Sequence, residues 1–210
     1  MSKIIDINAE GLLKVVKELE KFPSEIRPAM ARAVNRTIDS TNTKVKREVA
    51  AEYAVKQKEI AKEIKKERAN VNKLTGALVA EGSPTPLYRF SHTPQLPNVR
   101  TRYGVKVKVK KSGGKKKILH HGNKAFILAI KRKDDSAANM IFARRRNTRY
   151  PIDKLFTLSV PQMISDLDGE KGTIQRIKAH ANQTLEKTID QEINYRLDKM
   201  AKKAEKEKAK

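Results

Sequence analysis

The sequence predicts an α+β protein, with long N-terminal amphipathic helices packed on an antiparallel β-sheet and a long C-terminal helix. Apolar residues recur at spacings of three, four or seven near both ends of the chain, as on one face of a helix. Between them the period changes to that of strands. A chain of 210 residues can bury one moderate core, so we expect a single domain. Its parts are the N-terminal helices at 1–70, a basic sheet at 71–160, and the C-terminal helix with its basic tail at 161–210.

The N-terminal part is predicted to be helical from residue 8 onward. Asn8 can cap a short helix, and Ser24 begins a longer one. The longer helix has an apolar stripe formed by Met30, Ala33, Val34, Ile38, Val45 and Val49. Its polar run at 37–43 is poor in helix formers, so we expect this helix to need packing partners there. A third helix is predicted at 55–67.

The middle part contains short apolar or alternating runs separated by Pro, Gly, Asn and Ser, which is the pattern of an antiparallel sheet. The predicted strands are LTGALVAEG, LYRF, GVKVKVKK, AFILAIK, MIFAR and KLFTLSV. In the third of these, valines alternate with Lys106, Lys108 and Lys110, so the three lysines should share one face, roughly 6.6 Å apart along it. The segment KSGGKKK at 111–117 has the composition of a basic hairpin tip.

The C-terminal part is predicted to be one long helix. We expect a break at Asp166–Gly172, after which Thr173 can cap the helix. Its apolar stripe consists of Ile174, Ile177, Ala181, Leu185, Ile189, Ile193, Leu197 and Met200. That stripe suits a helix packed on its own sheet or on a second copy. The tail at 201–210 has no apolar anchor.

Several classes of function are disfavoured by composition. The chain has no cysteine, which excludes disulfides and thiolate sites. It has no signal-peptide pattern and no apolar run long enough for a membrane span, so we expect no membrane partner and synthesis in a cytoplasm. No nucleophile elbow or phosphate-binding loop is present. We therefore predict neither an enzyme nor a cofactor.

The adjacent pair His120-His121 suggests a metal site, but the sequence argues against one. The other histidines, His92 and His180, lie far away in the sequence, and no nearby pair of acids completes a ligand set. Neighbouring residues on a strand point to opposite faces, so the two rings should not converge on one ion. We predict no metal and interpret the pair as part of a loop.

The net charge of +23 is concentrated in the middle of the chain. Residues 100–149 contain seventeen lysines and arginines against two aspartates. Such a surface needs a polyanion, counterions or acidic neighbours. We expect contact with the DNA backbone, or with an acidic neighbour, through Lys106, Lys108, Lys110, Lys115, Lys116, Lys117, Arg144, Arg145 and Arg146.

The alternative is that the lysines merely prevent association between sheet edges. Base-specific contact is not expected, because the basic segment carries few aromatics and no recognition helix is evident.

One motif is more specific. Arg149-Tyr150-Pro151-Ile152-Asp153, with Val160-Pro161 following, resembles the corresponding block of the prophage minor tail protein Z family, the tail-completion proteins of long-tailed phages such as lambda. Ala33-Val34-Asn35-Arg36 resembles the Ala-x-Asn-Arg element of the same family. The resemblance covers residues 25–165.

The resemblance implies a structural virion protein at the neck, which would form a ring of six copies at the head-proximal end of the tail. Its expected partners are further copies of itself, the tail terminator or tail tube, the head connector and packaged DNA. Under this hypothesis Tyr150, Pro151 and Ile152 anchor a turn in the core, and Asp153 offsets a nearby arginine or caps local amides. Ala33, Val34, Asn35 and Arg36 would lie on a helix that packs between subunits.

Two alternatives remain open. One is a protein that coats nucleic acid non-specifically, of phage or mobile-element origin, and the other is a transient tail-assembly factor. The motif could also be no more than a turn that leads into a strand.

Overall fold

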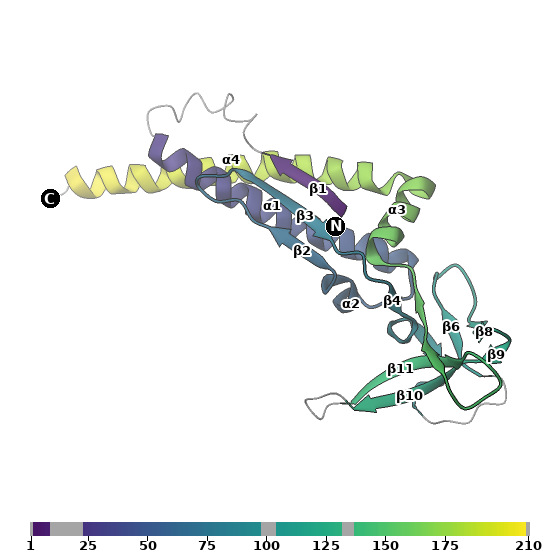
Figure 1. The fold of residues 1–210 in the computed structure, drawn as a ribbon. Coiled ribbons are helices and arrows are strands. Elements are labelled where there is room, and N and C mark those ends of the chain that lie inside the picture. The colour runs from purple at the N-terminus through teal and green to yellow at the C-terminus, as the bar shows by residue number, and fades with distance from the viewer. Residues whose placement is uncertain (1, 9–22, 98–103, 132–136, 209–210) are drawn as a thin grey trace. The chain divides into compact units, whose positions relative to one another are not determined.

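The computed structural model describes residues 2–8, 23–97, 104–131 and 137–208 (Figure 1). The chain divides into two compact units. Unit 1 consists of residues 1–45, 64–81 and 166–210, and unit 2 of residues 46–63 and 82–165. Each unit therefore combines segments from more than one of the three parts expected from the sequence. The helices and antiparallel strands confirm the α+β class, with a long helix near each end of the chain.

Unit 1 contains an antiparallel sheet in the order β1-β3-β2. Its strands are β1 (Ser2–Asn8), β2 (Ile64–Glu67) and β3 (Thr75–Ala80). The strand predicted from LTGALVAEG is confirmed as β3, which is almost entirely buried because it lies in the centre of the sheet.

One of the N-terminal predictions is wrong and one is not tested. Asn8 is the last residue of strand β1, and the short helix predicted after it lies outside the described residues. The helix predicted at 55–67 is reduced to α2 (Gln57–Ala61), and the chain then enters β2. The cause is tertiary, since pairing with β3 supplies the backbone hydrogen bonds of β2.

The long N-terminal helix is confirmed as α1 (Pro23–Glu52). All six residues of its predicted apolar stripe are at most 1% exposed. The polar run is packed as expected. The buried hydroxyl of Thr37 donates to Ala33 O at 2.9 Å and lies 3.2 Å from the hydroxyl of Thr188. These contacts satisfy the hydrogen-bonding capacity of the Thr37 hydroxyl.

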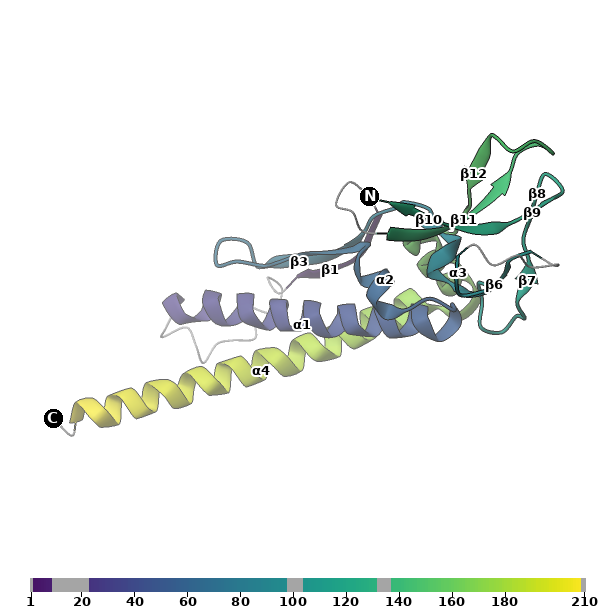
Figure 2. The same cartoon turned by 90° about the horizontal axis from the view of Figure 1, so that it is seen from below.

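The C-terminal helix is confirmed as α4 (Thr173–Lys208), which runs antiparallel to α1 in unit 1 (Figure 1, Figure 2). Ser40 on α1 lies 3.1 Å from the His180 ring, and Arg36 lies 2.7 Å from Glu192. The predicted stripe of α4 is buried from Ile177 to Ile189. Beyond it the buried positions are charged, at Glu192 and Arg196, whereas the predicted members Ile193 and Leu197 are only half-buried.

The predicted break before α4 is shorter than expected. Helix α3 (Val160–Lys171) continues through most of it, and the interruption is Gly172, whose φ of 56° lies in the left-handed region. The carboxylate of Asp168 accepts a hydrogen bond from Ile174 N at 2.9 Å. Asp168 thus provides the capping contact that we expected from Thr173.

Unit 2 is built from small antiparallel sheets and does not contain the single sheet predicted. The sheet orders are β5-β6-β7, β8-β9, β10-β11-β12 and β13-β4. The strands are β4 (Thr85–Pro86), β5 (Ser91–Thr93), β6 (Lys106–Lys108), β7 (Lys116–Lys117), β8 (Leu119–His120), β9 (Asn123–Lys124), β10 (Phe126–Lys131), β11 (Ala137–Arg144), β12 (Ile152–Lys154) and β13 (Phe156–Thr157).

The prediction of a strand at LYRF is wrong, because this segment forms the 3-10 helix η3 (Leu87–Arg89). The last predicted strand is divided between β12 and β13, and α3 begins at its final residue, Val160. The core of the unit includes Tyr53, Phe90 and Ile141, each at most 2% exposed. Among the described residues, no helix combines the length and apolar character that a membrane span would need.

Candidate functional site

The predicted lysine strand is β6, which pairs with β5 on one edge and with β7 on the other. Val105 and Val107 are buried, at 1% and 2% exposure, and the alternation of side chains directs Lys106 outward. The register places Lys106 directly opposite Lys117, and Val107 opposite Lys116. Like charges directly opposite each other destabilise a sheet, so this hairpin concentrates positive charge at an energetic cost that an anion would relieve.

The predicted row of three lysines is only partly formed. Strand β6 ends at Lys108, and Lys110 instead forms an isolated bridge with Tyr53, with its ammonium 6.0 Å from the centre of the Tyr53 ring. The hairpin tip predicted from KSGGKKK is confirmed, since β6 and β7 pair around it. Lys115 at its end donates a hydrogen bond to the Thr93 hydroxyl, which ties the tip to β5.

The arginine-rich segment forms a turn between β11 and β12, which we call the arginine turn (residues 145–151). Arg145 N donates to Pro151 O at 3.1 Å and closes the turn. Arg144, Arg146 and Arg149 are exposed, and the guanidinium of Arg149 lies 5.7 Å from the centre of the Tyr150 ring. Within the part of the chain that the structure describes, neither Arg144 nor Arg146 has a carboxylate partner.

Arg145 differs from its neighbours because it is paired. Its Nη2 lies 2.7 Å from Asp153 Oδ1, and its Nε lies 3.1 Å from Asp153 Oδ2. These hydrogen bonds from Arg145, followed by one from His120, lower the pKa of Asp153 to about 2. The same pair raises the pKa of Arg145. The expectation that Asp153 offsets a nearby arginine is therefore confirmed, and much of the charge of Arg145 is directed at Asp153.

The expectation that Tyr150 and Pro151 anchor the turn in the core is wrong. Tyr150 is 65% exposed, Pro151 is also exposed, and Ile152 is half-buried. The Tyr150 ring packs against the guanidinium of Arg149 at the surface, where cation–π contact replaces core packing. The turn is held by backbone hydrogen bonds and by the Arg145–Asp153 pair.

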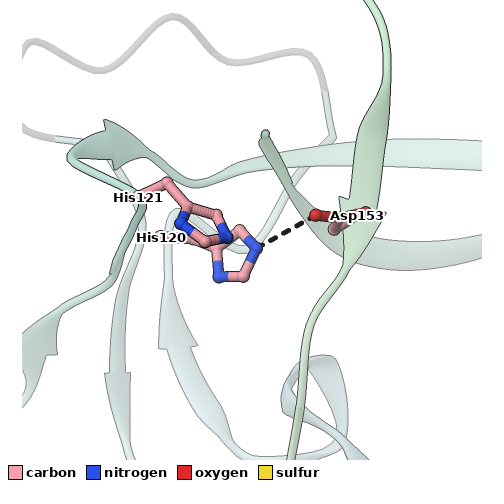
Figure 3. Close-up of side chains that lie close together, drawn as sticks. All are labelled: His120, His121 and Asp153. Atoms are coloured by element: carbon pink, nitrogen blue, oxygen red, sulfur yellow. Dashed lines mark hydrogen bonds and ion pairs between the residues drawn. The ribbon is translucent and has the colours of Figure 1, made fainter. Parts of the chain in front are cut away.

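The two adjacent histidines also behave differently from the prediction. Strand β8 ends at His120, and His121 has a φ of 48°, which reorients its side chain. The two rings therefore meet edge to face with their centres 4.3 Å apart (Figure 3). His120 Nε2 lies 3.0 Å from Asp153 Oδ2. The prediction that the two rings diverge assumed a continuous strand, and the turn removes that assumption.

Hydrogen bonds connect the hairpin of β6 and β7, which we call the lysine hairpin, with the histidine pair and the arginine turn. Val105 N donates to Ala125 O at 3.1 Å, and Ile118 N donates to Val105 O at 3.0 Å, which joins β6 to the β8–β9 hairpin. Asn123 Nδ2 in that hairpin donates to Arg144 O at 3.2 Å. The basic segments that are separate in the sequence thus belong to one connected part of unit 2.

Sequence reasoning missed a second basic feature, a pocket of about 980 Å³ in unit 2. Five cationic side chains line it, namely Lys56, Lys62, Arg89, Lys108 and Lys111. Arg89 is held by Glu59 and Glu63, at 3.1 and 2.8 Å. Only Lys108 belongs to the predicted contact set. The others come from separate segments and no spacing rule joins them, so only the fold could bring them together.

The predicted subunit-packing residues lie on α1. Ala33 and Val34 are fully buried, so their packing partners belong to this chain. The side chain of Asn35 binds the backbone of Ala69, which follows β2. Its Nδ2 donates to Ala69 O and its Oδ1 accepts from Ala69 N, both at 2.9 Å. Arg36 is exposed and pairs with Glu192. A packing role between subunits could rest only on the outward side of this helix, and it stays a prediction.

Comparison with known protein families finds a match over most of the chain. A sequence model described as prophage minor tail protein Z (GPZ) matches residues 9–203. The match includes both the arginine turn and the segment from Ala33 to Arg36. Comparisons with curated proteins and with solved structures find no match. Because the family match spans nearly the whole chain, this protein belongs to the prophage minor tail protein Z family.

Proposed function

We propose that this phage minor tail protein completes the tail at its head-proximal end. Six copies form a ring in the neck, between the tail terminator or tail tube and the head connector, and packaged DNA passes through it. The protein acts by binding and positioning, without catalysis. It is made in the bacterial cytoplasm and remains in the virion.

The observation that carries this proposal is the concentration of exposed positive charge in unit 2. Lys106 and Lys117 are exposed cross-strand neighbours. Arg144 at the end of β11 and Arg146 in the arginine turn are exposed and have no carboxylate partner among the described residues. Lys and Arg side chains bind phosphates without reading base sequence. A neck protein needs such contacts, because DNA of any sequence must pass through it or lie against it.

An acidic face of an adjoining ring protein would satisfy the same charges. Both environments relieve the repulsion between Lys106 and Lys117. The proposal therefore states that the lysine hairpin and the arginine turn face DNA or an acidic neighbour in the assembled neck. The isolated subunit does not need high affinity for DNA, since a ring would add the contributions of its copies.

The test neutralises only arginines that are exposed and have no carboxylate partner in the described part of the chain. We expect the double substitution Arg144→Gln and Arg146→Gln to leave the fold intact and to lower the infectious yield. Arg145 is spared because it holds Asp153. Tails assembled with the variant as the only source of the protein are mixed with filled heads, and joined particles and infectious titre are counted.

The matched control is Lys178→Gln with Lys187→Gln, which removes two exposed charges from α4 in unit 1. This control should join heads normally. A normal yield from the arginine variant would exclude the proposed role of those arginines. Tight binding of isolated wild-type protein to duplex DNA, with a log–log salt slope of about 0.9 per phosphate contact, would instead favour a non-specific coating protein.

A further inference from the structure

The two adjacent histidines and Asp153 form a compact cluster of metal-binding groups. One ligand atom from each of His120, His121 and Asp153 lies within 4.8 Å of the others. The three side chains come from the end of β8, from the turn that follows it and from β12, and they converge from two sides (Figure 3). His120 is half-buried and His121 is exposed, so an ion can reach the cluster from solvent.

We propose that His120, His121 and Asp153 bind a divalent transition-metal ion such as Zn²⁺. Two imidazoles and one carboxylate are the ligand types that suit Zn²⁺, Co²⁺, Ni²⁺ and Cu²⁺, whereas Mg²⁺ and Ca²⁺ prefer oxygen ligands. Water completes the coordination. This proposal does not depend on the role in the neck.

The distances require only small side-chain movements. Metal–ligand bonds of about 2.1 Å in a tetrahedral site separate the ligand atoms by about 3.4 Å. The atoms of the cluster lie within 4.8 Å of one another, and His120 Nε2 is 3.0 Å from Asp153 Oδ2. Rotation of the exposed His121 side chain brings the third ligand closer. The His120–Asp153 hydrogen bond is then replaced by two bonds to the ion.

Arg145 can remain in place when the ion binds. Its Nη2 contacts Asp153 Oδ1 at 2.7 Å, while Oδ2 is the atom nearest His120. A carboxylate that binds a metal through one oxygen commonly accepts a hydrogen bond on the other, and that partner orients it. Arg145 would lose its second, longer contact to Oδ2 and keep the first.

The ion would join two separate sheets. His120 ends a strand of the β8–β9 sheet, and Asp153 lies in the β10-β11-β12 sheet. Asp153 also anchors the arginine turn through Arg145. Metal binding would therefore fix the β8–β9 hairpin against the base of that turn, in addition to the hydrogen bond from Asn123 to Arg144 O.

The experiment is a titration of the full-length protein, without a histidine tag, with ZnCl₂ in a calorimeter. We expect saturation at one ion per chain. His121→Ala should weaken binding by about tenfold or more, since one of the three protein ligands is lost. His180→Gln is the matched control, because it removes a histidine of unit 1 and should leave the affinity unchanged.

A spectroscopic measurement guards against a variant that binds poorly because it is misfolded. Co²⁺ bound to the wild-type protein should give visible absorption bands of a four- or five-coordinate ion, and His120→Ala, with a native circular dichroism spectrum, should lose them. The proposal is overturned if Zn²⁺ does not saturate at one ion per chain. It is equally overturned if His121→Ala and the wild type bind with the same affinity.

Discussion

At the scale of single residues, the ion pair between α1 and α4 joins a buried glutamate to an exposed arginine. Glu192 is 3% exposed, and its Oε1 lies 2.7 Å from Arg36 Nη1, whereas the Arg36 side chain is 59% exposed. Glu192 Oε2 is buried and has no hydrogen-bond partner among the residues that the structure describes. A carboxylate in this position depends on its cationic partner, because it has little access to water.

We therefore expect Arg36→Ala to lower the free energy of unfolding by about 2 kcal/mol. Removing the guanidinium leaves a buried carboxylate less compensated, but the exposure of Arg36 reduces the effect below that of a fully buried pair. Urea unfolding followed by circular dichroism measures the change. Arg32→Ala is the control, since Arg32 is an exposed arginine one turn earlier on the same helix and should change stability by less than about 0.5 kcal/mol. Equal effects of the two substitutions would contradict the importance of the pair.

Sequence reasoning at this scale predicted that Asp153 offsets an arginine but not which arginine it would be. The arginines of the turn are evident in the sequence, yet only the return of the chain through β12 selects Arg145 as the partner of Asp153. The histidine pair shows the same limit. Its convergence depends on the positive φ of His121, and the strand pattern around it gave the opposite expectation.

At the scale of elements, the helices were the most predictable features. The stripe on α1 extends over several turns, so each additional buried residue reinforces the same period of 3.6. Strands β1 and β2 were missed because a strand of a few residues carries little periodic signal. Both form by pairing with β3, which is a long-range interaction that the local sequence does not encode.

The contact between β3 and α1 provides a test of this packing. A Cβ added at Gly76 would lie 2.4 Å from Ile38 Cδ1 and 2.8 Å from the backbone oxygen of Glu67. We expect Gly76→Ala to lower the free energy of unfolding by about 1–3 kcal/mol, because the backbone oxygen cannot move aside without disturbing β2. Urea unfolding is again the measurement.

Gly82→Ala is the matched control for that substitution. No atom lies within 4 Å of a Cβ built at Gly82, which follows shortly after β3. Its stability should remain within about 0.5 kcal/mol of the wild type. If Gly76→Ala were as stable as this control, β3 would not pack against α1 as closely as described.

At the scale of the whole molecule, the proposed function concerns an assembly. We expect tails purified with this protein to carry six copies at the head-proximal end, visible as a six-fold ring by electron cryomicroscopy. Tails produced without the protein should lack that density and should fail to join heads. Absence of the protein from finished virions would instead indicate a transient assembly factor.

The division of unit 1 among distant segments has a consequence for synthesis on the ribosome. Helix α1 is made early, but α4, whose Thr188 contacts Thr37 of α1, is translated only after all of unit 2. During elongation the side of α1 that meets α4 therefore stays uncovered while unit 2 is made. We expect the nascent chain to need chaperone protection until α4 emerges from the ribosome.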